Sequence, residues 1–84
     1  MKVTKENAKI LINDAGHLQM SGDYINIVIS PVEYVGYTTD PYINGDGRID
    51  CISVYLHLYS NTISIDMDED LLKDLEDATK QILF

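Results

Sequence analysis

Residues 48–67, RIDCISVYLHLYSNTISIDM, decide the fold of this chain, because apolar and polar side chains alternate in them with the period of a β-strand. We expect a strand over residues 48–59, a turn at Ser60 and Asn61, and a returning strand over residues 62–67. The inward positions of the two strands are aliphatic or methionine: Ile52, Val54, Leu56, Leu58, Ile63, Ile65 and Met67. The outward positions of the first strand are Cys51, Ser53, Tyr55, His57 and Tyr59. The pattern predicts an antiparallel sheet with one buried face and one polar, aromatic face.

The residues that follow predict an amphipathic helix. Asp68 is a suitable N-cap, and Glu69 and Asp70 lie favourably at the positive end of the helix dipole. Apolar residues at helical spacing form the stripe that we expect to face the core: Leu71, Leu75, Ala78 and Ile82.

The N-terminal residues 5–15 also match a helical period. Thr4 is a suitable cap, Gly16 suits the end of a helix, and the apolar positions are Ala8, Leu11, Ile12 and Ala15. The prediction is a first helix over residues 5–15. A short strand at residues 10–12 is the alternative.

The middle of the chain predicts short strands separated by turns. We expect strands over residues 17–20 and 24–30, with Ile25, Ile27 and Ile29 alternating toward one face. Pro31 bends the chain or marks a sheet edge, and another strand covers residues 32–37. A loop rich in turn residues then occupies 38–47. The predicted fold class is α+β: an antiparallel sheet of four or five strands, with N-terminal and C-terminal helices packed on one face.

Length and composition limit the class of protein. The 84 residues suffice for one compact domain, 1–84, with a single core. Cys51 is the only cysteine, which excludes an internal disulfide and a thiolate zinc cluster. The sequence shows no apolar run of a signal peptide and no stretch near the ~20 apolar residues of a membrane span. We therefore expect a cytoplasmic protein that does not bind membranes.

Acidic residues dominate the charge. The chain carries 14 acids against six lysines and arginines, a net charge of −8, and residues 66–84 hold seven acids and two lysines, a net −5. On the expected helix, Asp70, Asp74 and Asp77 form an acidic stripe beside the core stripe. This balance argues against direct nucleic-acid binding and favours a basic protein as the partner. The alternative is a solvated helix face that only keeps the protein soluble.

Two groups of residues suggest metal binding, and each has a simpler explanation. Residues 44–50, NGDGRID, resemble the middle of a calcium loop of the EF-hand or dockerin kind, with Asn44 and Asp46 as ligands. Tyr42 and Ser53 stand where that loop needs acids, and Asn-Gly before a strand predicts a hairpin turn. Asp66, Asp68 and Asp70 could crowd a metal ion, but helix-start roles explain the last two better.

A catalytic centre is not expected. Cys51 and His57 share one face of a strand, but six residues of about 3.3 Å each separate them by ~20 Å, too far for a nucleophile–base pair. We find no sequence motif for an enzyme, and we expect neither a cofactor nor a metal.

Tyrosine supplies six of the seven aromatic residues, and side chains of this type are enriched at interfaces. The alternative is that the tyrosines pair across strands and stabilise the sheet. The leading hypothesis is a small acidic inhibitor of a basic nucleic-acid enzyme, in which carboxylates stand where phosphates would lie. In size, charge and composition the chain is similar to phage anti-CRISPR proteins and to nuclease immunity proteins. The second hypothesis is an adaptor, chaperone or assembly module that binds through the tyrosine face, and a homodimer through that face stays open. The predicted partner-binding residues are Asp66, Asp70, Asp74, Asp77, Tyr24, Tyr55 and Tyr59.

Overall fold

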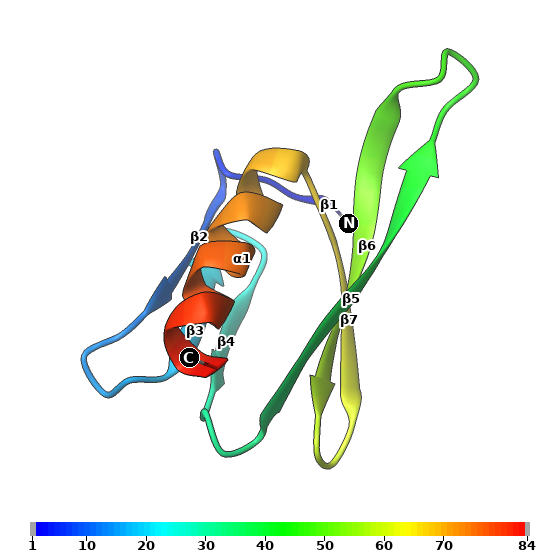
Figure 1. The fold of residues 1–84 in the computed structure, drawn as a ribbon. Helices are drawn as coiled ribbons and strands as arrows, with labels where there is room; N and C mark the ends of the chain where they lie inside the picture. Colours follow the sequence, from blue (N-terminus) through cyan, green and yellow to red (C-terminus); the bar gives the residue numbers. More distant parts are fainter. Residues whose placement is uncertain (1, 84) are drawn as a thin grey trace.

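The hairpin predicted from residues 48–67 forms the centre of the larger of two sheets (Figure 1). The computed structural model describes residues 2–83, and in it β6 (Ile49–Leu58) pairs antiparallel with β7 (Thr62–Met67). The register places Ile52 opposite Met67 and Val54 opposite Ile65, and all four side chains are buried. The alternation of apolar and polar residues therefore fixed the inward face correctly.

Two further strands complete this four-stranded sheet, in the order β1-β7-β6-β5. The strand β1 (Lys2–Val3) pairs parallel with the end of β7, and β5 (Tyr34–Ile43) pairs antiparallel with β6. The predicted loop at residues 38–41 is wrong, because these residues belong to β5. Thr38 and Thr39 are polar but β-branched, and a strand accommodates such residues well where its faces are exposed.

The N-terminal region forms a second, three-stranded sheet where the sequence predicted a helix. Its strands are β2 (Ala8–Ile12), β3 (Leu18–Gly22) and β4 (Asn26–Ile29), in that order. Ala8 and Ile10 are buried, whereas Lys9 and Leu11 are exposed, which is the period of a strand. The helix predicted over residues 5–15 is therefore wrong. The alternative, a short strand at residues 10–12, is correct in its type of secondary structure, although the strand begins earlier, at Ala8.

The C-terminal helix was predicted correctly. It is α1 (Glu69–Leu83), and the carboxylate of Asp68 accepts a hydrogen bond of 2.9 Å from the backbone amide of Leu71, as an N-cap does. Leu71, Leu75 and Ala78 are buried. The helix packs mainly along β2, in front of the three-stranded sheet in Figure 1.

The predicted fold class is wrong in its architecture. Within residues 2–83 the chain is mostly strand, arranged as two sheets with a single helix at the C-terminal end (Figure 1). The chain passes between the sheets at the turn after β4, where the amides of Glu33 and Tyr34 both donate to the carbonyl of Ser30. Pro31 lies in this turn, and it cannot donate a hydrogen bond to continue a strand ladder. The bend predicted at Pro31 is therefore present.

The far end of the β5–β6 hairpin projects from the rest of the molecule (Figure 1). The overall extents of 42 × 24 × 21 Å reflect this arm. Because the inward residues of both sheets and of α1 meet in one core, the opposite side of the four-stranded sheet faces solvent. Thr38 and Ser64, which flank Tyr55 on that side, are exposed.

Candidate protein-binding surfaces

The acidic stripe of α1 is exposed at its ends and partly covered in the middle. Asp70 and Asp77 are exposed, whereas the Asp74 side chain is only 30% exposed. A carboxylate oxygen of Asp74 lies 3.5 Å from the Nζ atom of Lys5, which the turn after β1 brings to the helix. This is the one ion pair within the described residues. Lys5 therefore lies against the middle of the acidic stripe.

Asp66 belongs to a different surface from the helix carboxylates. It lies in β7 on the outer side of the four-stranded sheet, where the hydroxyl of Ser53 donates a hydrogen bond of 2.9 Å to its Oδ1 atom. Asp40 of β5 is the other cross-strand neighbour of Ser53. The carboxylates of Asp40 and Asp66 thus lie on either side of Ser53 on this face, one on each of the two strands that neighbour β6.

The three predicted tyrosines come from separate parts of the structure. Tyr55 is half-buried in β6, Tyr59 lies exposed in the turn after β6, and Tyr24 lies exposed just before β4. The backbone amide of Tyr59 donates to the carbonyl of Glu33, so this end of the hairpin lies against the turn after β4. Tyr24 lines a cleft together with Ser64, the cross-strand partner of Tyr55. The structure therefore does not gather the three tyrosines into one group: Tyr24 borders this cleft, Tyr55 lies within β6, and Tyr59 lies in the turn after β6.

The sequence interpretation missed an exposed apolar group at the tip of the β5–β6 arm. Tyr42, Ile43 and Ile49 are 60%, 59% and 45% exposed. The prediction assigned Tyr42 and Ile43 to a loop over residues 38–47, so it gave no reason to expect these two residues on a strand of a projecting hairpin. Ile49 follows the turn at residues 44–48 and pairs directly with Ile43.

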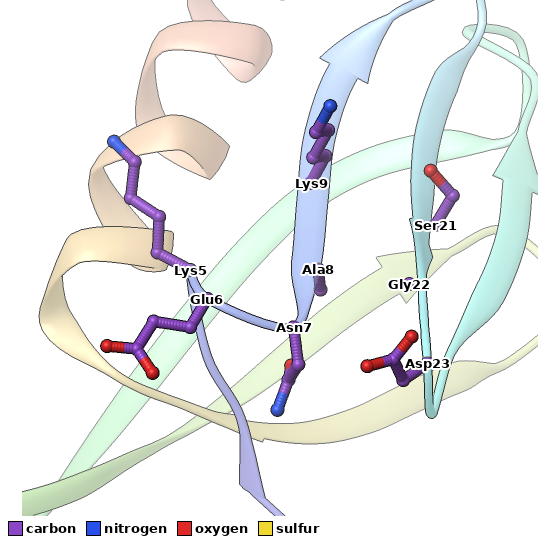
Figure 2. Close-up of a pocket in the computed structure, with 8 residues that line it drawn as sticks. All are labelled: Lys5, Glu6, Asn7, Ala8, Lys9, Ser21, Gly22 and Asp23. Carbon is purple, nitrogen blue, oxygen red and sulfur yellow. The ribbon is translucent and has the colours of Figure 1, made fainter.

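Two clefts, each of about 320 Å³, are present on the surface. The first, shown in Figure 2, is lined by Lys5, Glu6, Asn7, Ala8, Lys9, Ser21, Gly22 and Asp23. Figure 2 shows the Lys5 and Lys9 side chains pointing away from the Asn7 and Asp23 side chains, so these polar groups do not converge on one point. The second cleft lies between β4 and the edge of the four-stranded sheet, and half of its lining residues are isoleucines.

The side chains that suggested metal or calcium binding have structural roles. The Oδ1 atom of Asn44 accepts hydrogen bonds from the backbone amides of Asp46 and Arg48, at 3.0 and 3.2 Å, and these bonds close the turn of the hairpin arm. Asp68 caps α1 through its Oδ1 atom. Across residues 2–83 there is no group of three or more His, Cys, Asp or Glu side chains that could hold a metal ion.

The histidine of β6 is likewise engaged within the sheet. The Nε2 atom of His57 lies 2.8 Å from the hydroxyl of Thr38 on β5, and its Nδ1 atom lies 3.4 Å from the hydroxyl of Thr62. Cys51 is half-buried near the other end of the same strand. The imidazole thus joins three strands of the sheet.

Two tyrosines near the helix have shifted acidities. Burial raises the pKa of Tyr34, and the hydrogen bond from Thr79 opposes that shift. Partial burial and the nearby Glu76 carboxylate raise the pKa of Tyr37. Because both pKa values are raised, the phenols of Tyr34 and Tyr37 are protonated at neutral pH. In this form they carry no charge and can donate hydrogen bonds.

No protein-family model, no curated protein and no solved structure matches this chain. In the part of the chain that the structure describes, no helix is long and apolar enough to cross a membrane.

Proposed function

We propose that this chain is a small acidic, non-enzymatic protein that binds a basic protein and blocks it, with a nucleic-acid-binding enzyme as the target. The observation that carries this proposal is the balance of surface charge. Of 14 acids in the sequence, only Asp74 has a lysine or arginine nitrogen within 4 Å in residues 2–83. A surface of carboxylates without close cations attracts a cationic groove, speeds association and discourages nucleic acid.

The helix α1 is well placed to present part of this charge. Its inner side is fixed by the buried Leu71, Leu75 and Ala78, so the exposed carboxylates of Asp70 and Asp77 are carried on a rigid support. Rigid carboxylates can occupy the positions of phosphates, which is how a nucleic-acid mimic of the anti-CRISPR or nuclease-immunity type would block its target. We propose the cytoplasm as its location.

The arm of the β5–β6 hairpin favours a second candidate function. Tyr42, Ile43 and Ile49 are each exposed near its end, where Ile43 and Ile49 form a cross-strand pair, and exposed apolar residues of this kind commonly mark a protein interface. An adaptor or assembly module would bind through these side chains and tolerate salt, whereas a charge-based inhibitor would lose affinity as salt rises.

The experiment that separates the two candidates starts with capture of a partner on the immobilised chain from nuclease-treated lysate, followed by elution along a salt gradient. Affinity is then measured for a helix variant in which Asp70, Asp74 and Asp77 are changed to Asn. A matched control removes the same charge from exposed turn residues through the changes D14N, D23N and E33Q. Folding should be nearly unchanged in both, because exposed charges contribute little to stability.

The inhibitor proposal predicts a basic partner released by moderate salt, with a larger loss of affinity in the helix variant than in the control. Equal losses would show that only overall charge matters. Full binding by the helix variant would reject the helix as the binding surface. Loss of binding in a Tyr42→Ser, Ile43→Ser variant would then support the adaptor.

A further inference from the structure

The cleft between the two sheets is bordered by strand edges that have no partner strand. On one side β7 pairs with β6, but on its other side it pairs with β1 only at Asp66 and Met67. Residues 62–65 therefore have no neighbouring strand on that side, within the part of the chain described. Across the cleft, β4 is the last strand of its sheet and pairs only with β3. Backbone groups at such edges are free to bond with an added chain.

The lining of this cleft has an apolar interior and a polar rim. The apolar residues are Val3, Ile25, Ile27, Ile63 and Ile65. Tyr24, Ser64 and Asp66 supply the polar groups. Along β7 the alternation of side chains directs Ile63 and Ile65 toward the core, as their pairing with Leu56 and Val54 requires, and directs Ser64 and Asp66 outward.

We propose that this cleft binds an extended segment of a partner protein as an added strand along residues 62–65 of β7. The segment carries apolar side chains that point into the cleft, alternating with outward side chains that include a lysine or arginine next to Asp66. β1 already lies against the same side of β7 at the next two residues, so this side of the strand accepts a backbone neighbour. Strand addition of this kind takes affinity from main-chain hydrogen bonds and specificity from alternate side chains.

The charge of the segment follows from Asp66, which is the only charged residue in the lining. Its Oδ1 atom accepts a hydrogen bond from Ser53, and within residues 2–83 no lysine or arginine nitrogen lies within 4 Å of its carboxylate. Lys2 is the residue of β1 in register with Asp66, but its Nζ atom donates a hydrogen bond of 2.6 Å to the carbonyl oxygen of Asp50 instead. A cation on the bound segment would therefore supply the missing partner. The length follows from the free edge, since four strand residues span about 13 Å. This inference does not depend on the surface of α1 that the proposed function uses.

Synthetic peptides test the proposal directly. The probe is a short peptide of alternating valine and lysine. One control peptide has glutamate in place of lysine, and another is N-methylated at alternate amides and so loses backbone donors while keeping its side chains. Binding is followed by titration of the ¹⁵N-labelled protein. We expect shifts of the amides of residues 62–65 and 26–29, and affinity lower by about fivefold or more for each control peptide.

Charge-changing variants complete the test. Asp66→Lys should reverse the preference from the lysine peptide to the glutamate peptide, while Asp14→Lys, the same charge change in the exposed turn after β2, should leave the preference unchanged. Asp66→Asn provides the milder change if the lysine variant is unstable, and it should weaken binding of the lysine peptide alone. Equal binding of the N-methylated peptide, equal effects of the two lysine variants, or absence of shifts in residues 62–65 would each overturn the proposal.

Discussion

The buried hydrogen bond between Tyr34 and Thr79 offers a quantitative test of how α1 is attached to the sheets. The two side chains are 3% and 8% exposed, and their hydroxyl oxygens lie 2.9 Å apart. Changing Tyr34 to Phe leaves the Thr79 hydroxyl without this partner, and changing Thr79 to Val does the same to the phenol. An unsatisfied buried polar group costs about 1–3 kcal/mol, so each single change should lower the free energy of unfolding by that amount.

The double variant should lose much less than the sum of the two single losses, because it leaves neither hydroxyl unsatisfied. We expect a coupling free energy of about 1–2 kcal/mol. Urea denaturation followed by circular dichroism measures it, provided that the slope with denaturant stays constant across the variants. Tyr59→Phe is the matched control, since this phenol is 79% exposed and its removal should change stability by less than about 0.5 kcal/mol. Additive single effects would show that the two hydroxyls do not interact and that the contact between α1 and β5 is misplaced.

Three further changes test other parts of the fold. A Cβ at Gly22 would lie 2.7 Å from the Cα of Ala8, so Gly22→Ala should cost about 1–3 kcal/mol by denaturant titration, whereas Gly45→Ala, with open space around it, should cost far less. Leu75 is fully buried, so Leu75→Ala should lose about 2–5 kcal/mol, and a thermal shift within noise would contradict its place in the core. Because burial raises the pKa of Tyr34 above 10.0, its protonated form contributes stability that is complete below the unfolded pKa and lost as pH rises through the folded one. Denaturation between about pH 9 and about pH 11 should therefore show a smaller loss for Tyr34→Phe than for the unchanged chain, and an equal loss would count against this assignment.

The sequence predicted correctly those elements whose hydrophobic pattern is long enough to match only one type of secondary structure. In β6 the alternation extends from Cys51 to Leu58, and a one-residue shift would place Val54 and Leu56 in solvent. In α1 the stripe from Leu71 to Ala78 agrees with the cap at Asp68, so two independent signals indicate the same helix.

The prediction for the N-terminal region was wrong because the short segment 8–12 matches both the period of a helix and the period of a strand. Ala8 and Ile12 fit a helical stripe, but Ala8 and Ile10 also share one face of a strand, and only pairing with β3 decides between them. Gly22 shows how close that pairing is, because the structure leaves no room for a side chain opposite Ala8. Local propensity does not contain this information, since it arises from pairing with residues of β3 that are 6 to 14 positions away.

The candidate surfaces were predictable in composition but not in arrangement. The count of acids was evident from the sequence, whereas the ion pair of Lys5 with Asp74 joins residues 69 positions apart. The cleft beside β7 depends on where β1 stops pairing and on the approach of β4 from the other sheet. The ion pair and the cleft both arise from tertiary packing. The periodicity of side chains within one segment does not show how segments pack together.

The position of the helix has a consequence for the order in which the chain can fold during synthesis. The three strands β2, β3 and β4 leave the ribosome before α1, with Leu18 and Met20 on the face that α1 later covers. A small sheet of this kind has little stability until another element buries its apolar face, and α1 is translated last among the described elements. β1 must likewise wait for the end of β7. The apolar face of this sheet therefore stays accessible to chaperones until α1 has been synthesised, and the native core forms only after that step.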